Sequence, residues 1–329
     1  QIVDKQLKLY VVDAYRVARD AQMGVRINTV MQTCFFKLAN VLPEDEAIAR
    51  IKDTITKTYG KRGETILKRN FAAVDGALSA LHKVEVPSEV TSKYHLTAGF
   101  QGEAEPFVLN VLGEIMAGNG DRLPVSAMPV DGTFPTGTTQ YEKRSVALDI
   151  PIWDAEICIQ CGLCSLGCPH AAIRMKAYPP EALEGAPDGF VAVDWKGKEY
   201  PGWKMTVQVA PEDCTGCGLC VDVCPAKSRE AAKHRAINMQ PKLDHLEKER
   251  ANYKFFLSIP DVDRATVKAD TVKGSQLLLP LFEYSGACAG CGETPYLKLI
   301  TQFFGDRMLA CNATGCSSIY GGNLPTTPY

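Results

Sequence analysis

The chain has 329 residues, 46% of them hydrophobic and 22% charged, a composition that argues against a disordered or fibrous protein. Its 36 basic and 38 acidic residues nearly balance, so neither a nucleic acid nor an anionic membrane is expected as a partner. The longest apolar run, residues 277–282, is much shorter than the roughly 20 residues that span a bilayer, and the N-terminus lacks a signal-peptide pattern. We therefore expect a soluble protein of two or three domains.

Residues 1 to about 103 have the pattern of a mixed α/β domain. A short strand is predicted at 9–13 and a helix at 14–22. Residues 44–59 open with acidic residues and repeat isoleucine at helical spacing, and 64–83 carry an apolar stripe of the same period. These stripes predict a hydrophobic core and no cofactor fingerprint.

Residues 104–144 change to turn-forming composition with little helical period. They predict an extended linking segment that ends in the tripeptide Glu142-Lys143-Arg144. Two interpretations stay open: a free linker, or a belt whose apolar residues pack on neighbouring domains.

Twelve of the thirteen cysteines fall into three short blocks. Such blocks in a long chain without an export signal favour metal or redox chemistry over disulfides. Cys34 lies among apolar residues on a predicted helix and is expected in the core. Two blocks share the spacing C-x2-C-x2-C-x3-C-P: Cys158, Cys161, Cys164 and Cys168, and Cys214, Cys217, Cys220 and Cys224.

This doubled spacing is typical of two-cluster ferredoxins, in which the fourth cysteine of each block binds the other cluster. The predicted ligand sets therefore cross. One set is Cys158, Cys161, Cys164 and Cys224, and the other is Cys214, Cys217, Cys220 and Cys168. A pair of zinc sites is the alternative, although zinc sites usually separate two C-x2-C pairs. Gly162 and Gly218 occupy equivalent positions and would let backbone N–H groups approach cluster sulfur.

The segment between these two blocks, residues 178–213, is expected to be largely an insertion into the ferredoxin-like repeat. After the repeat, residues 245–250 predict a charged helical face. Residues 277–284 are apolar enough for a buried strand, and a helix is predicted at 296–304.

The third cysteine block supplies Cys288 and Cys291, and Cys316 is a plausible third ligand 25 residues further on. Cys311 follows an apolar pair in a predicted strand, so a packed core cysteine is favoured over a ligand. Taken alone, one C-x2-C pair leaves zinc possible. The chain begins with Gln1 and stops in a Gly/Pro/Thr-rich stretch, so we expect a fragment whose fourth ligand lies outside it.

With these motifs, the chain resembles the central part of pyruvate:ferredoxin (flavodoxin) oxidoreductases over essentially all its residues. The resemblance rests on GVRINTVMQTCFF at 24–36, LPVSAMPVDGTFPTGTTQYEKR at 123–144, the doubled ferredoxin motif, and GACAGCGETPY with NATGCSSIYGG near the end. The assignment to pyruvate, rather than to another 2-oxo acid, depends on this resemblance alone.

The resemblance implies a multidomain α/β and α+β architecture. Its expected parts are the C-terminal part of a coenzyme-A-associated α/β domain (1–103), the linking segment (104–144), a ferredoxin-like domain with two 4Fe-4S clusters (145–261), and the beginning of an α/β domain that binds thiamine diphosphate (262–329). The full enzyme is expected to be a homodimer with three 4Fe-4S clusters, thiamine diphosphate and magnesium.

The implied reaction is the oxidative decarboxylation of pyruvate with coenzyme A to acetyl-CoA and CO2, with electrons passed to ferredoxin or flavodoxin. By resemblance, Cys288, Cys291 and Cys316 would hold the cluster nearest thiamine. Glu293 and Cys316 would face thiamine diphosphate, although Glu293 could instead be a helix N-terminal acid. Asn28 and Asn70 match asparagines near coenzyme A. We expect this chain alone to bind the two ferredoxin-type clusters without oxidising pyruvate.

Three functional interpretations compete: part of this oxidoreductase or of a sister 2-oxo acid enzyme, a stand-alone two-cluster electron carrier, and a zinc-organised interaction module. The terminal cysteine block favours the first. Oxygen-sensitive clusters imply a reducing cytoplasm or an anaerobic organelle. Basic residues that could meet an acidic electron carrier, or simply be solvated, are Arg174, Lys176, Lys227, Arg229, Lys233 and Arg235.

Overall fold

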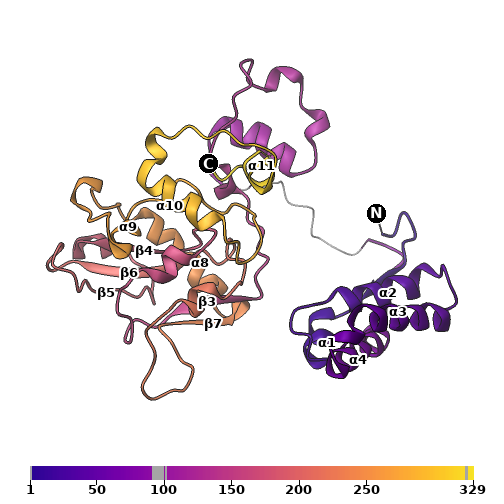
Figure 1. Cartoon of the computed structure of the whole chain (residues 1–329). Helices are drawn as coiled ribbons and strands as arrows, with labels where there is room; N and C mark the ends of the chain where they lie inside the picture. The colour runs from indigo at the N-terminus through magenta and orange to yellow at the C-terminus, as the bar shows by residue number, and fades with distance from the viewer. Residues whose placement is uncertain (1, 91–99, 101, 323–324) are drawn as a thin grey trace. The chain divides into compact units, whose positions relative to one another are not determined.

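The computed structural model describes residues 2–90, 100, 102–322 and 325–329. The chain divides into two compact units, residues 1–96 and 97–329. In Figure 1 the first unit is coloured indigo to purple and the second magenta to yellow. The boundary predicted near residue 103 adjoins residues 91–99 and 101, which lie outside the described residues.

The first unit is a four-helix array with one two-stranded ribbon. Strands β1 (Leu9–Val11) and β2 (His82–Val84) pair antiparallel, with Leu9 opposite Val84. The helices are α1 (Ala14–Asp20), α2 (Asn28–Ala39), α3 (Glu44–Tyr59) and α4 (Glu64–Ala80). The strand and helices expected from periodicity are confirmed, except that residues 82 and 83 belong to β2 and not to the last helix.

Local sequence explains the helix boundaries in this unit. The Asp13 side chain caps α1 by accepting the N–H of Arg16 at 3.0 Å. Three acids fill the first turn of α3, where the helix dipole favours negative charge. Helix α4 buries alanines against α1 and α2, and these small side chains allow close helix approach. Cys34 lies in this core and is 4% exposed, as predicted.

The second unit contains two small antiparallel sheets. Strand β3 (Asp149–Trp153) pairs with β7 (Ile237–Pro241), and β4 (Ile173–Tyr178) pairs with β6 (Lys204–Val209), which also pairs with β5 (Val193–Asp194). The α-helices are α5 (Gly113–Met116), α6 (Leu163–Gly167), α7 (Leu219–Asp222), α8 (Lys242–Ser258), α9 (Val272–Ser275), α10 (Thr294–Phe304) and α11 (Cys316–Gly322). One π-helical turn spans Val108–Leu112. The 3-10 turns of this unit are Gly120–Arg122, Val125–Ala127, Thr138–Tyr141, Pro180–Leu183, Arg264–Thr266 and Gly305–Arg307, and the first unit has one at Gly60–Arg62.

The sequence repeat has a matching structural repeat. Strand β3, a cysteine loop, α6 and β4 follow one another in the first half, and β6, a cysteine loop, α7 and β7 follow in the second. Each sheet pairs a strand of one half with a strand of the other. The insertion predicted at 178–213 is therefore too long, because β6 belongs to the repeat and only residues 179–203 are added.

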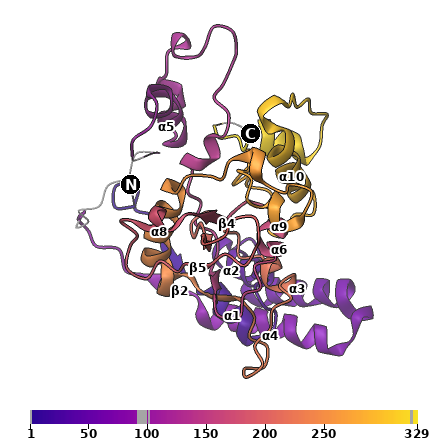
Figure 2. The ribbon, with the colours of Figure 1, turned by 90° about the vertical axis from the view of Figure 1, so that its left-hand side faces the viewer.

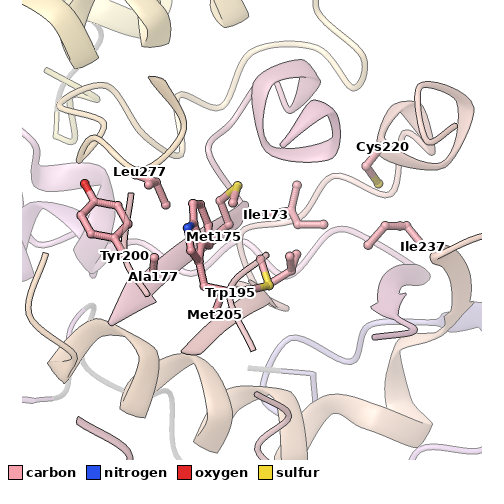
Figure 3. Packing of buried hydrophobic residues seen from close by; sticks show 10 residues of the cluster. Ile173, Met175, Ala177, Trp195, Tyr200, Met205, Cys220, Ile237 and Leu277 are labelled. Carbon is pink, nitrogen blue, oxygen red and sulfur yellow. The ribbon is translucent and has the colours of Figure 1, made fainter. Parts of the chain in front are cut away.

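The core of this unit continues beyond the ferredoxin-like repeat. Figure 3 shows Met175 and Met205 beside Trp195 of the insertion, with Leu277 of the later segment in the same cluster. Side chains from β4, β6 and β7 make up most of the remainder. A second cluster joins Ile150 and Phe256 to Tyr284.

The strand predicted at 277–284 is wrong. Leu277, Leu278 and Phe282 are buried, but their segment has no strand partner among the described residues. The backbone hydrogen bonds of this segment are not those of a sheet. The Leu278 carbonyl accepts a hydrogen bond from the Gln302 side chain at 2.8 Å, and Pro280 has no N–H to donate. An apolar run thus signals burial here without signalling a sheet.

Candidate iron-sulfur site

Four cysteines from both halves of the repeat line one cavity. Cys158, Cys161 and Cys164 come from the first cysteine loop and the start of α6, and Cys224 comes from just after α7. The cavity has about 390 Å³ of empty space, including its open mouth, and its wall includes apolar side chains such as Met175 and Ile237.

The other four cysteines line a second cavity of about 360 Å³. Cys214, Cys217 and Cys220 belong to the second loop and α7, and Cys168 follows α6. The two cavities thus divide the eight cysteines into the same crossed sets that the spacing predicts. The division follows from the fold, because α6 and α7 pack together and each delivers its last cysteine toward the opposite loop.

The two cysteine loops have the same backbone geometry. Gln160 and Gly216, at equivalent positions, both have left-handed backbone angles, φ 58° and 69°. Their N–H groups donate to Cys158 Sγ at 3.3 Å and Cys214 Sγ at 3.4 Å. Such N–H donors stabilise negative charge on sulfur. Glutamine is unusual in this conformation, which favours glycine.

Gln160 is held there by its own side chain. It is 2% exposed, its Nε2 donates to the Asp194 carbonyl at 2.7 Å, and its Oε1 accepts the Lys196 N–H at 2.9 Å. The inserted segment therefore fixes the first cysteine loop through two hydrogen bonds. The second loop has glycine at this position and needs no such support.

Burial raises the pKa values of cysteine thiols in both sets. Burial raises the pKa of Cys164 to about 12, and the nearby Cys158, Cys161 and Cys224 add to the shift. Burial also raises the pKa of Cys214 to about 12, although the Gly216 N–H opposes it. Thiolates in such surroundings require nearby positive charge.

The donor set fits a 4Fe-4S cluster in each cavity. Within the described residues, no three His, Cys, Asp or Glu side chains are arranged to hold a single metal ion, as a zinc site would require. A cubane is instead held by four thiolates placed around it, which is how each set of four cysteines lines its cavity. Apolar walls would limit water at both.

The third cysteine block lies against the second cavity. A Cβ built on Gly290 would lie 3.7 Å from Cys217 Cβ, so the Cys288 to Cys291 loop contacts the second ferredoxin-type loop. His170, two residues after Cys168, has Nε2 3.2 Å from the Cys288 carbonyl and Nδ1 3.2 Å from Ser285 Oγ. Because a carbonyl can only accept, Nε2 must be the donor.

Cys291 lies three residues before the beginning of α10. Burial raises its pKa, but hydrogen bonds from the N–H groups of Thr294 and Glu293 outweigh burial and lower it overall. This environment favours a thiolate. Cys288 and Cys316 are exposed, and Cys316 is the first residue of α11.

Glu293 contacts α11 rather than solvent alone. Its Oε1 accepts a hydrogen bond from the Tyr320 hydroxyl at 3.0 Å, so the start of α10 contacts the helix that carries Cys316.

The prediction that Cys311 is a packed core cysteine is wrong. Cys311 is exposed, Leu309 before it is 95% exposed, and no strand covers them in the described part of the chain.

The two asparagines singled out by resemblance lie close together in the first unit. Asn28 is exposed and begins α2, whereas Asn70 on α4 is 5% exposed. Asn70 Oδ1 accepts from Thr29 Oγ1 at 3.4 Å, and Asn70 Nδ2 donates to the Ile66 carbonyl at 2.9 Å. Asn70 of α4 thus contacts the residue that follows Asn28 at the beginning of α2.

Two of the basic residues proposed to meet an electron carrier are buried, which corrects that interpretation. Arg174 is 6% exposed and pairs with Glu283, and Lys176 is 8% exposed and pairs with Asp261 at 3.0 Å. They face the interior, because β4 is buried on both faces. Exposed basic residues remain in the loop after Cys224: Lys227, Arg229 and Lys233.

Sequence reasoning missed Gln160, His170 and Lys298, which all contact the cysteine loops. Lys298 on α10 donates to the carbonyls of Leu166 and Cys168 at 3.0 and 3.1 Å. Burial lowers its pKa to about 8. In the sequence, Lys298 shares a helical face with Thr294, Thr301 and Gln302. A polar helical face normally predicts exposure to solvent, so this pattern does not indicate that Lys298 is buried.

Comparison with known proteins matches three family models to successive parts of the chain. A model described as pyruvate ferredoxin/flavodoxin oxidoreductase matches residues 1–80, a domain of unknown function matches 96–147, and a 4Fe-4S dicluster domain matches 157–228. The last match covers both cysteine loops. No helix in the described residues is long and apolar enough to cross a membrane.

Relatives match over the full chain. It is 56% identical to a pyruvate-flavodoxin oxidoreductase of Nostoc sp. and 53% identical to a pyruvate:ferredoxin oxidoreductase of Moorella thermoacetica, with all of this chain covered but 28% and 27% of theirs. It is 39% identical to a pyruvate dehydrogenase [NADP(+)] of Cryptosporidium parvum, again over the whole chain and over 18% of that protein. The chain thus spans about a quarter of the first two relatives. Its motifs, dicluster domain and full-length matches show that it belongs to the pyruvate:ferredoxin (flavodoxin) oxidoreductase family.

Proposed function

We propose that this chain is the electron-relay part of an enzyme that oxidatively decarboxylates pyruvate with coenzyme A and passes the electrons to ferredoxin or flavodoxin. The observation that carries the proposal is the division of eight cysteines into two crossed sets around two cavities. The whole enzyme's activity, substrates and acceptor come to this chain from its relatives' names.

A 4Fe-4S cluster bound in each cavity would supply one-electron transfer. Cys158, Cys161, Cys164 and Cys224 would hold one cluster, and Cys214, Cys217, Cys220 and Cys168 the other. The N–H groups of Gln160 and Gly216 would stabilise negative charge on the ligand sulfurs.

The third block would hold a cluster through Cys288, Cys291 and Cys316. Its loop contacts Cys217, so electrons from this block would reach the second cavity before the first. This contact favours an enzyme part over the stand-alone electron carrier, because a carrier needs only the two ferredoxin-type sites.

The remaining assignments follow the family resemblance. Residues 262–329 would begin the domain that binds thiamine diphosphate and magnesium, with Glu293 and Cys316 facing the thiamine. Asn28 and Asn70 would lie near coenzyme A, in keeping with the contact of Asn70 with Thr29, the neighbour of Asn28. We further propose a homodimeric enzyme in a reducing cytoplasm, where low-potential clusters persist.

The proposal is tested by anaerobic reconstitution of the chain with iron and sulfide. We expect about eight irons and eight sulfides for two 4Fe-4S clusters, with the electron paramagnetic resonance of two coupled reduced clusters after dithionite treatment. The Cys34→Ser variant is the control, because Cys34 lies in the other unit's core and should leave the iron content unchanged. Stoichiometric zinc without sulfide would favour the zinc module and reject the relay.

A further inference from the structure

Lys298 is a buried cation beside the element that joins the two cysteine cavities. It is 1% exposed, and α10 places it against the C-terminal end of α6. Figure 2 shows α6, α9 and α10 as neighbours. Cys164 lies within α6 and lines the first cavity, and Cys168 directly follows α6 and lines the second.

Three main-chain carbonyls surround the Lys298 nitrogen. Its Nζ donates to the carbonyls of Ser165, Leu166 and Cys168. Carbonyl oxygens only accept, so three of them require three N–H donors, which an ammonium has and a neutral amine lacks. The geometry therefore describes a positively charged side chain.

This charge has no carboxylate partner among the described residues. Lys298 forms no ion pair there, and the neighbouring Arg174 guanidinium, a second cation, pairs with Glu283. The cavity that Lys298 lines also holds Asp261, whose charge is paired with Lys176 at 3.0 Å, whereas Ser165, Gln276 and Gln302 in the same lining are neutral. A buried cation normally needs a negative counterpart. The cysteine ligands Cys164 and Cys168 are the negative groups in reach once clusters are bound, because Lys298 Nζ contacts the backbone of Cys168 and of Ser165, which directly follows Cys164.

We propose that the Lys298 ammonium raises the reduction potential of the clusters bound through Cys164 and Cys168, an inference that rests on the proposed function. Reduction adds one electron to a cluster and breaks no bond, so the cluster gains one negative charge. A fixed cation in a low-dielectric interior stabilises that added charge more than it stabilises the oxidised form. Lys298 thus acts by holding a positive charge near the cluster ligands, and it lies on α10, which follows Cys288 and Cys291 in the chain.

The test is a redox titration of the reconstituted chain, followed by electron paramagnetic resonance with dithionite as reductant. In Lys298→Gln the side chain keeps a hydrogen-bond donor and loses the charge. We expect its reduction equilibrium to fall tenfold or more, which is about 59 mV for a one-electron couple. Lys298→Arg should stay near the wild-type potential because it keeps the charge.

The matched control is Lys176→Gln, which also removes a buried lysine. Lys176 has Asp261 as its counter-charge and lines neither cysteine cavity, so its loss should shift the potential little. If Lys298→Gln assembles about eight irons and shifts no more than this control, the inference is overturned.

A second variant covers the case in which Lys298→Gln does not assemble clusters. Gln276 accepts from Ser165 Oγ at 3.0 Å and shares a cavity with Lys298. Gln276→Glu has nearly the same shape and would offset the ammonium, so the potential should fall; an unchanged potential contradicts the inference. Failure of the wild-type chain to assemble clusters would instead count against the proposed function.

Discussion

Gln160 shows how one side chain can hold a backbone conformation that its own residue type disfavours. Its φ of 58° costs about 1–2 kcal/mol relative to ordinary backbone. Two buried hydrogen bonds to residues of the insertion offset that cost. The result is an N–H aimed at Cys158 Sγ, matching the one that Gly216 supplies without strain.

We expect Gln160→Ala to lower the free energy of unfolding by about 2 kcal/mol, since it loses both hydrogen bonds and keeps the strain. Gln160→Gly loses the same bonds but relieves the backbone, so it should be about 1 kcal/mol less destabilising than alanine. Anaerobic urea unfolding of the reconstituted chain measures both. Equal stability of the alanine variant and the wild type would show that the side chain does not hold the loop.

At the scale of elements, the crossed cysteine sets follow from how the two half-repeats pair. Strands β3 and β4 of the first half pair with β7 and β6 of the second, so the halves interlock. The cysteine that follows each short helix therefore lines the cavity of the other half: Cys168 after α6 lines the second cavity, and Cys224 after α7 lines the first.

Substituting these two cysteines separately tests the crossing. In Cys224→Ala we expect loss or conversion of the cluster held by Cys158, Cys161 and Cys164, with the other cluster intact. Cys168→Ala should have the opposite effect, because a 4Fe-4S cluster needs all four thiolates. Each variant should retain about four irons as one intact 4Fe-4S cluster, distinguished by its resonance spectrum. If both variants lose the same cluster, the ligand sets do not cross.

Helix α8 packs against the sheets through buried side chains that include Phe256 and Tyr253. Phe256 is 1% exposed and packs in the cluster that contains Ile150 and Val209. Phe256→Ala should destabilise the chain by about 3–5 kcal/mol, because it leaves a cavity that the sheets cannot fill. Leu257→Ala is the control; Leu257 is 53% exposed, and its loss should cost under about 0.5 kcal/mol in the same unfolding measurement.

The sequence predicted the features that depend on local spacing. Helices α3 and α4 follow from apolar periodicity, and the cysteine sets follow from a motif whose geometry is set within a few residues. Burial set by distant partners was not predictable. Arg174 pairs with Glu283, 109 residues away, and Lys298 meets Cys168, 130 residues away. In isolation each looks like an ordinary surface charge.

Helix α10 illustrates the same limit. Its buried residues are Thr294, Lys298, Thr301 and Gln302, whereas Tyr296 and Phe304 are 70% and 51% exposed. Periodicity finds the helix but assigns its apolar face to the core, which is the wrong side. The buried polar face is explained only by the carbonyls and amides that it meets.

At the scale of the whole second unit, the end of the linking segment, residues 138–144, forms a packed belt through polar contacts, whereas Val125, Met128 and Val130 earlier in the segment are exposed, so the expected apolar packing is wrong for them. Lys143 pairs with Asp213 at 2.6 Å, immediately before Cys214. Thr139 Oγ1 donates to the Glu283 carbonyl at 2.7 Å, and the Thr139 N–H donates to the Thr327 carbonyl at 3.1 Å. The segment therefore connects the ferredoxin-like repeat with the last described residues.

Glu142 is the charged centre of that connection. Its Oε2 accepts from Thr326 Oγ1 at 2.5 Å and from Arg144 Nη2 at 3.1 Å. Burial raises the pKa of Glu142, but these two hydrogen bonds and the Arg144 charge outweigh burial and lower it below its usual 4.5. A carboxyl whose folded pKa is lowered stabilises the fold above its unfolded pKa and loses that contribution as the pH falls through the folded value.

Glu142→Gln keeps the shape and removes the charge. At neutral pH we expect the variant to open more readily by about 1 kcal/mol, a value reduced for partial exposure to solvent. The difference from wild type should be constant from pH 7 to about pH 5 and shrink below about pH 4.5, as the wild-type carboxylate takes up its proton. Hydrogen exchange at the Thr327 amide, which donates to Thr138 Oγ1 at 2.8 Å, reports this opening directly. A difference that grows on acidification would mean that the carboxylate opposes the packing of the belt, because only a group whose folded pKa is raised gains stability as the pH falls.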